Sequence, residues 1–203
     1  MTGKMRFIGI LVFWAMVSCL VYSGISRADN PVDDNFILEE TEDFSVSYPM
    51  DWDKKTKGDI LIITGPVLTT EQDRPKKPFI TIKKDTEESA AASARKTKEN
   101  YYNWKKLPNI KNKMMEFMMK NLVKEYRDGK YEFISYDFEE NENFIMQHII
   151  DIDKERNMKI YTVDFITKAE PVKRYSMMFV CPEEHFDKYL PIFKKCVKSF
   201  NVD

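Results

Sequence analysis

Apolar and polar residues alternate along four stretches of the C-terminal half of the chain. The stretches are Tyr131–Phe138, Phe144–Ile152, Lys159–Ile166 and Tyr175–Cys181. A period of two is typical of β-strands with one buried face. Because the connections between these stretches are short and polar, they predict an antiparallel meander of four strands.

A further alternating stretch lies nearer the N-terminus. Phe44, Val46 and Tyr48 fall on one side of it, and Pro49 follows. Proline has no N–H for a sheet ladder, so Pro49 is expected to end the strand. Trp52 comes three residues later and is expected to cover the end of the core, since its large ring buries much apolar surface.

Two more strands are predicted before the first helix. Asp59–Thr64 is an apolar run between glycines, which predicts a strand covered on both faces, and Phe79–Lys83 is a second one. The preceding acidic segment is expected to become ordered around Phe36 to Leu38. Together with the meander, these stretches supply the strands of one sheet.

Three helices complete the predicted elements. Asp85 and Glu88 have the spacing of a capping box and predict a helix that runs towards Pro108. A second helix is predicted over Ile110–Tyr126, because its apolar residues recur at helical spacing. Pro182 opens the third helix, and Pro191 is expected to kink it. Its apolar face holds Phe186, Leu190, Phe193, Val197 and Phe200.

The first residues have the pattern of an export signal. Lys4 and Arg6 precede the apolar run Phe7–Tyr22, and Ala28 ends a stretch suited to cleavage. Two alternatives stay open, namely lipidation at Cys19 and an uncleaved membrane anchor. All three place the rest of the chain in the periplasm or outside the cell. The predicted division is 1–28 signal peptide or anchor, 29–43 acidic leader and 44–203 a single domain.

The net charge and the length of the chain argue against a nucleic-acid-binding protein and for a single domain. The whole chain has a net charge of −1, and removal of the three basic residues of the signal leaves −4. A nucleic-acid-binding protein would show a basic surface, so no nucleic-acid partner is expected. The residues after the signal suffice for one domain with one core.

The element order resembles the PsbP-like superfamily. The residues that carry the resemblance are Phe44, Tyr48, Pro49, Trp52 and the final pair Ser199 and Phe200. This superfamily includes the extrinsic photosystem II protein, a nuclear import factor that binds Ran and exported bacterial proteins of the DcrB type. The resemblance implies an α+β fold in which an antiparallel sheet carries helices on its faces, as an α/β/α sandwich, and it implies a structural role for these six residues. It implies binding of partners and carries no catalytic site.

Methionines in the second predicted helix are the first candidate for a site. They are Met114, Met115, Met118 and Met119. Flexible thioethers suit an adaptable groove for a partner protein, and soft sulfur also suits Cu(I). The same side chains serve as well to fill gaps in a core. A partner groove is the functional hypothesis, and no metal is assigned.

The other candidate residues favour structural roles. His148 lies among apolar residues, as a hydrogen-bonded core histidine does, whereas His185 is expected near solvent. Asp151–Asn157 imitates a calcium loop but lacks its glycine, so it predicts a charged hairpin turn. Cys181 and Cys196 are separated by mostly helical residues, which favours two buried thiols over a disulfide.

No motif in the chain points to a reaction or a cofactor. A phosphate-binding loop, a nucleophile elbow and a zinc-binding helix are all missing from the sequence. We therefore expect a non-enzymatic exported protein that binds an envelope protein through a sheet edge or the methionine-bearing helix. The alternative is a binder of a small apolar ligand or lipid between sheet and helices, and a hydrolase comes third.

Overall fold

A computed structural model describes residues 35–70, 75–86, 88–106 and 129–202. Its strands are β1 (Phe36–Glu40), β2 (Ser45–Pro49), β3 (Asp53–Lys57), β4 (Ile60–Thr64), β5 (Phe79–Asp85), β6 (Tyr131–Glu140), β7 (Phe144–Asp153), β8 (Met158–Thr167) and β9 (Arg174–Pro182). Its helices are α2 (Glu88–Lys106), the short 3₁₀ turn η1 (Glu183–His185) and α4 (Phe186–Ser199).

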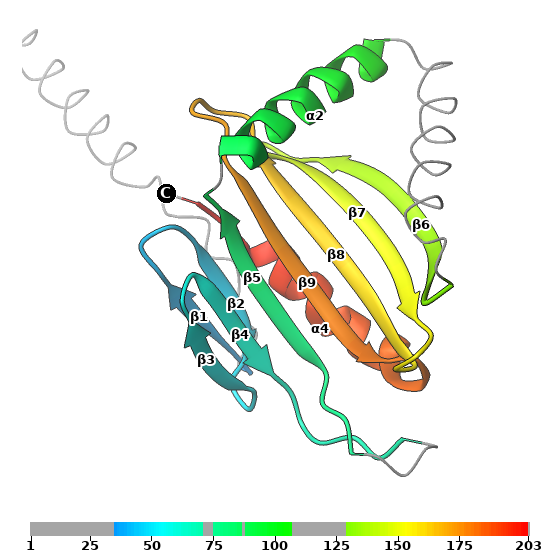
Figure 1. Ribbon diagram of the computed structural model, residues 1–203. Coiled ribbons are helices and arrows are strands. Elements are labelled where there is room, and N and C mark those ends of the chain that lie inside the picture. The colour runs from blue at the N-terminus through cyan, green and yellow to red at the C-terminus, as the bar shows by residue number, and fades with distance from the viewer. Residues whose placement is uncertain (1–34, 71–74, 87, 107–128, 203) are drawn as a thin grey trace, which may run out of the picture. The chain divides into compact units, whose positions relative to one another are not determined.

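Seven strands form one sheet in the order β3-β4-β5-β9-β8-β7-β6, and every neighbouring pair is antiparallel. The meander predicted from the alternating stretches is confirmed as β6 to β9. The remaining two strands, β1 and β2, pair only with each other in a separate hairpin. In Figure 1, β3 and β6 lie at opposite ends of the large sheet.

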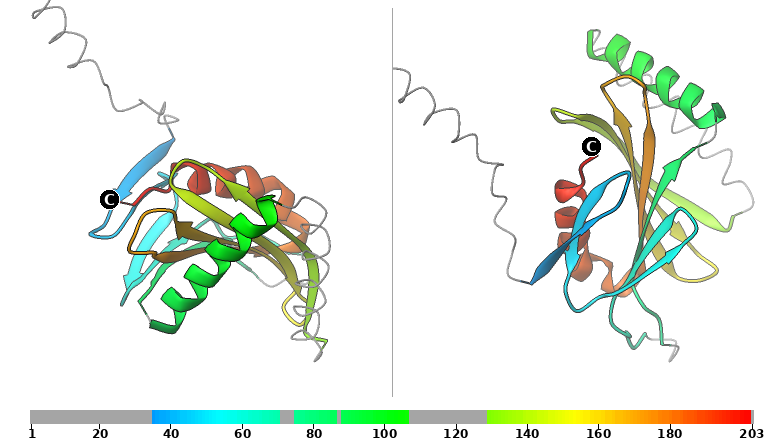
Figure 2. Two further views of the ribbon diagram at one scale, coloured as in Figure 1. Left: turned by 90° about the horizontal axis from the view of Figure 1, so that it is seen from above. Right: turned by 90° about the vertical axis from the view of Figure 1, so that its left-hand side faces the viewer.

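The two helices pack on opposite faces of this sheet (Figure 2). The predicted α+β class, with helices on both faces of an antiparallel sheet, is confirmed. Aromatic rings fill the face that carries α4, where those of Phe179 and Phe193 stack at 5.3 Å. Fully buried rings on this face are Phe144, Phe165, Tyr175, Phe179, Phe186 and Phe193.

The face that carries α2 has a smaller core. Trp104 of α2 meets Phe138 of β6 at 5.4 Å between ring centroids, and Ala94 is buried beside the sheet. Ile145 and Ile166 complete this core from β7 and β8. Each of the two helices therefore packs on the sheet through its own apolar face, as its amphipathic pattern predicts.

The β1–β2 hairpin is fastened to the C-terminal end of α4. Ser45 and Asn201 exchange backbone hydrogen bonds of 2.9 and 3.0 Å. The Ser47 amide donates to the Ser199 hydroxyl at 2.8 Å, and that hydroxyl donates to the Cys196 carbonyl at 2.9 Å. The final residues of the domain thus lock its first strands in place.

Two details of the predicted elements are wrong. The run ending at Thr64 is not covered on both faces, because only Leu61 and Ile63 of β4 are buried. Asp85 is not a helix cap. It ends β5 and its carboxylate faces Arg174, so α2 begins at Glu88 without it. The strand β3 was not predicted at all. Pro191 lies inside α4, which continues through it.

Trp52 covers one end of the core, as the sequence predicts. Its side chain is 5% exposed and lies 6.1 Å from the ring of Tyr189. Gly65, just after β4, gives the indole room: a Cβ atom there would lie 2.9 Å from the Trp52 ring and 2.8 Å from the ring of Pro78. This contact sets the connection between β2 and β3 against the end of β4.

We expect Gly65→Ala to destabilise the protein by about 1–3 kcal/mol, the usual cost of overpacking a rigid core. Neither the indole nor the proline ring can swing aside, because both are ring systems held by the core. Urea unfolding followed by circular dichroism measures the effect. Gly58→Ala is an instructive comparison, since nothing lies within 4 Å of a Cβ there and its cost comes only from a φ of +57°. An unchanged midpoint for Gly65→Ala would contradict this packing.

Candidate functional site

The open edge of the sheet at β3 is the candidate functional site. Among the described strands, β3 is the terminal one of the seven-stranded sheet and pairs there with β4 alone. All five of its residues are exposed. In an antiparallel edge strand, alternate residues direct their N–H and C=O groups away from the sheet. β3 therefore offers backbone donors and acceptors to an incoming strand.

The position of β3 is set by a turn at Gly58 after the strand and by the buried Trp52 before it. Gly58, with φ at +57°, turns the chain from β3 into β4, a conformation that glycine adopts without strain. At the other end, the buried Trp52 directly precedes the strand. In the register of the pair, Lys55 lies opposite Ile62 and Lys57 opposite Ile60. The strand is held by its hairpin and its ends, which leaves its own side chains in solvent.

Lysines dominate the side chains of β3. The Lys54 ammonium donates a hydrogen bond of 2.7 Å to Glu39 of β1, and this bond raises the pKa of Lys54. The carboxylate of Asp53 faces Lys77 at 4.0 Å. Lys55 and Lys57 are exposed and form no ion pair with any residue in the described part of the chain. Two uncompensated positive charges therefore lie on the open edge.

The opposite edge of the sheet, β6, differs in shape and charge. A bulge between Phe133 and Ser135 interrupts its register with β7. Two of its acidic side chains have basic neighbours: Glu132 meets Lys154 at 3.0 Å, and Glu139 lies 3.5 Å from His148, whose pKa is lowered by burial. A bulge makes a strand a poor template for further pairing.

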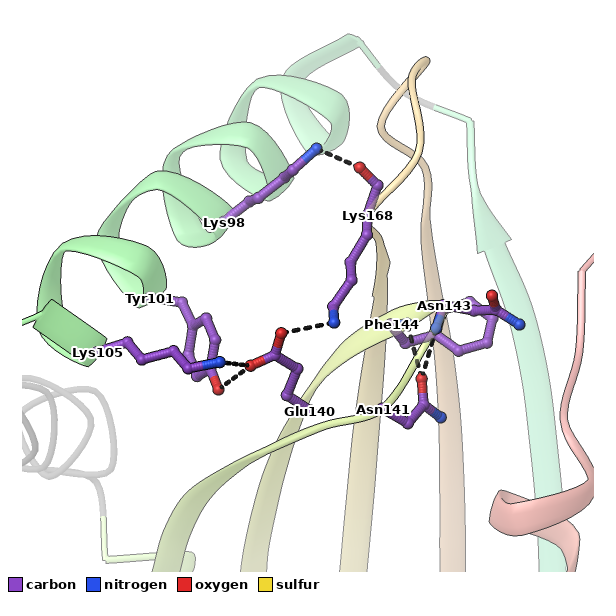
Figure 3. A network of polar contacts seen from close by, with 8 residues as sticks. All are labelled: Lys98, Tyr101, Lys105, Glu140, Asn141, Asn143, Phe144 and Lys168. Carbon is purple, nitrogen blue, oxygen red and sulfur yellow. Dashed lines mark hydrogen bonds and ion pairs between the residues drawn. The ribbon is translucent and has the colours of Figure 1, made fainter.

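A polar network at the end of β6 ties α2 to the sheet (Figure 3). Glu140 accepts hydrogen bonds from Lys105 at 2.6 Å and from the Tyr101 hydroxyl at 2.9 Å, and Lys168 pairs with it at 2.5 Å. These contacts, Lys105 first, lower the pKa of Glu140 to about 2. Burial and the same hydrogen bond raise the pKa of Tyr101 to about 12. Lys98 adds a bond of 2.6 Å to the Lys168 carbonyl.

Glu140→Gln is expected to lower the free energy of unfolding at pH 7 by about 1–2 kcal/mol, because solvent screens the exposed lysines. The folded pKa lies below the ordinary value of 4.5, so the stabilisation is complete above that value and is lost as the pH falls towards 2. Wild type should therefore lose stability more steeply than the variant between these limits. Urea unfolding at several pH values tests this, with the exposed Glu142→Gln as control. Parallel curves for wild type and Glu140→Gln would refute the role of Glu140.

His148 is a core histidine with a hydrogen bond, as predicted. Its Nδ1 lies 2.9 Å from the Tyr161 hydroxyl and its side chain is 14% exposed. Burial lowers the pKa of His148, and burial also raises the pKa of Tyr161. His185 donates from Nε2 to the Thr69 carbonyl at 3.0 Å, which fastens the first turn after β9 to the loop beyond β4.

An ion pair with a buried carboxylate lies on the α2 face of the sheet. Arg174 of β9 donates to the Asp164 carboxylate of β8 at 2.6 Å, and its Nε lies 3.6 Å from Asp85. Asp164 is 2% exposed. Burial, followed by the nearby Asp164 charge, raises the pKa of Tyr136 above its ordinary range. Together with Asp85 of β5, the pair links three strands, so we assign it a structural role.

A hollow of about 190 Å³ lies between α2 and the β8–β9 connection. Charged side chains dominate its lining, and two of them, Lys98 and Glu170, pair with each other at 3.1 Å. The lining residues are Arg95, Lys98, Glu99, Tyr102, Glu170 and Val172. The hollow is half open to solvent, whereas a small apolar ligand prefers an enclosed pocket.

The predicted partner-binding methionines, Met114, Met115, Met118 and Met119, lie outside the described residues, as do the predicted signal and Cys19. Within the described ranges there is no cluster of three acidic, histidine or cysteine side chains that could hold a metal. The predicted hairpin turn covers residues 154–157, whereas Asp151 and Asp153 lie in β7, and Asp153 accepts from the Arg156 amide at 3.0 Å.

The six residues of the family resemblance have packing roles. Phe44, Tyr48, Trp52 and Phe200 belong to the main core, Pro49 ends β2 opposite Phe36, and Ser199 holds the hairpin. Cys181 and Cys196 are free and buried, as the helical spacing favours, and burial raises the pKa of each thiol to about 12. None of these side chains forms a reactive group at the surface.

Sequence reasoning anticipated a sheet edge in general but did not locate β3. The segment Asp53–Lys57 has no apolar residue, so it lacks the alternation by which strands are recognised. The sequence holds only an indirect indication of this strand. A polar stretch is followed by Gly58 and then by an apolar strand, which is the order expected for a hairpin with one exposed strand.

No known protein family and no curated protein matches the sequence. Within the described residues, no helix is long and apolar enough to cross a membrane. The structure is similar to the solution structure of cyanobacterial PsbP (CyanoP) from Synechocystis sp. PCC 6803, with a TM-score of 0.43 and 10% identity, covering 88% of this chain and 99% of that chain. It is also similar to a protein from Bacteroides thetaiotaomicron VPI-5482, with a TM-score of 0.40 and 12% identity, covering 79% of this chain and 45% of that chain.

These similarities concern the fold alone. The α+β class itself is confirmed by the strand order and by the helices on the two faces of the sheet. Membership of the exported DcrB-type branch stays a prediction from the sequence.

Proposed function

We propose that this protein is an exported, non-enzymatic binding protein that captures a partner protein through the open edge of β3. The observation that carries the proposal is the exposure of all five residues of this terminal strand. Addition of a strand to such an edge is a common mode of peptide recognition, in which backbone hydrogen bonds supply affinity. The apolar N-terminal segment with Lys4 and Arg6 supports export.

The other hypotheses have less support from the described residues. Between the sheet and α4, aromatic rings fill the interior, and the hollow beside α2 is lined mostly by charged side chains. A ligand or lipid held between sheet and helices therefore has no favouring observation. The buried carboxylate of Asp164 pairs with Arg174, which suits a structural role rather than a hydrolase.

Site-specific photo-crosslinking in the native cell tests the proposal. A photoreactive amino acid is placed in turn at Thr56 of β3 and at two exposed control positions, Asn103 of α2 and Lys194 of α4. We expect one discrete partner protein, identified by mass spectrometry, to cross-link from Thr56 and not from the controls. The same cross-linked products from all three positions, or a discrete partner from the control positions alone, would refute binding at the β3 edge.

A further inference from the structure

We infer that the occupant of the β3 edge is an acidic strand of a partner protein, with acidic side chains two residues apart. This inference rests on the proposed function, because it names the partner of the same edge. Its evidence is the charge pattern of β3, which is independent of the exposure that supports the function.

Alternation along the strand places Lys55 and Lys57 on one face. Side chains two residues apart in a strand project from the same face, at a spacing of roughly 7 Å. Both lysines are exposed, and neither has an anionic partner among the described residues. A strand added beside β3 would bring side chains within about 5 Å of each of them. Two acids at positions i and i+2 of that strand would meet both charges.

The other face of β3 does not offer the same charge. Lys54, whose side chain projects from that face, is already bonded to Glu39 at 2.7 Å, and Thr56 is neutral. Asp53 shares the face of Lys55 and Lys57, and its carboxylate lies 4.0 Å from the Lys77 ammonium. Among the described residues, an incoming strand thus meets unpaired positive charge on that face only. This asymmetry predicts acids on alternate residues rather than a uniformly acidic segment.

A second copy of this chain is a poorer occupant. Pairing of β3 with another β3 would bring like charges together, which is the protection that lysines give to edge strands. Pairing with β6 of another copy would meet a strand whose register is broken by a bulge between Phe133 and Ser135. A strand from a different protein, with unpaired acids, avoids both difficulties.

Fluorescence anisotropy with labelled hexapeptides tests the inference. The probe is acetyl-TEVEVT-amide, and the comparison peptides are TKVKVT, TSVSVT and TEEVVT, the last with the same composition but adjacent acids. Two further forms of the probe carry N-methyl groups on the amides of both glutamates or of both valines. Because alternate residues of a strand direct their N–H groups to the same neighbour, one of these two forms removes the hydrogen bonds to β3. The proteins are wild type, Lys55→Glu/Lys57→Glu and the control Lys96→Glu/Lys188→Glu, which has the same charge change at exposed sites on α2 and α4.

We expect TEVEVT to bind wild type most tightly and the β3 variant roughly tenfold more weakly, with the control variant unchanged. The affinity should fall with added salt, and one N-methylated form should not bind.

Equal binding of all peptides by wild type and the β3 variant would overturn the acidic specificity and leave the edge function standing. Binding that survives both N-methylations, or an absence of binding by every peptide, would overturn strand addition by an acidic segment. Self-association in analytical ultracentrifugation that the β3 variant abolishes would identify a second copy as the occupant and also overturn the inference.

Discussion

Arg174→Met is expected to destabilise the protein by about 3–5 kcal/mol, measured by urea unfolding at pH 7. The substitution leaves the Asp164 carboxylate buried without its cation, and an uncompensated buried charge is among the most costly changes in a protein. The pair is direct, with 2.6 Å between the guanidinium and the carboxylate, and Asp164 is 2% exposed. The loss should therefore exceed that of a typical surface ion pair several times.

The double variant Arg174→Met/Asp164→Leu is the matched control. Replacement of both partners by apolar side chains removes the buried charge as well, so we expect it to recover most of the lost stability. A double variant less stable than Arg174→Met alone would show that the two residues do not act as a pair. A single variant within about 1 kcal/mol of wild type would contradict the burial of Asp164.

Phe200→Ala is expected to cost about 3–5 kcal/mol, the range for removal of a buried aromatic ring. The ring of Phe200 lies 4.3 Å from that of Phe165 and 5.5 Å from that of Phe44, and it also contacts Phe144 and Tyr175. It thus joins the N-terminal hairpin to three strands of the sheet. Thermal and urea unfolding measure the loss.

Hydrogen exchange gives a second readout of the same variant. Because Asn201 pairs with Ser45 immediately beyond Phe200, the amides of β1 and β2 should lose protection before those of β7 and β8. Phe200→Leu keeps most of the volume and should cost about 1–1.5 kcal/mol. Equal stability of the alanine and leucine variants would argue against a packing role for the ring.

The meander and the closing helix were predictable because each buries one face, and a buried face leaves a clear periodic pattern of apolar residues in the sequence. Alternate residues of β9, from Tyr175 to Cys181, are fully buried and can only face the core. The spacing from Phe186 to Phe200 likewise leaves one helical face for the sheet. Burial of one face is what period-two and period-3.6 patterns encode, so these elements were recoverable from the sequence.

The candidate site was not predictable in the same way. β3 has only polar residues, and it is a strand because the hairpin at Gly58 pairs it with β4 rather than because it buries a face. The misassignment of Asp85 has a similar cause. Its spacing to Glu88 suits a capping box, but its carboxylate is used across the sheet by Arg174. The conformations of β3 and of Asp85 both depend on contacts with other segments of the chain, and a local sequence pattern does not reveal such contacts.

Nuclear magnetic resonance of isotope-labelled protein titrated with the TEVEVT peptide tests the central claim most directly, because it locates the bound segment. We predict shift changes concentrated in the amides of residues 53–57, with backbone contacts between peptide and β3 in nuclear Overhauser spectra. Changes centred on α2, α4 or β6, with the β3 amides unmoved at saturation, would contradict the claim that this edge is the binding site.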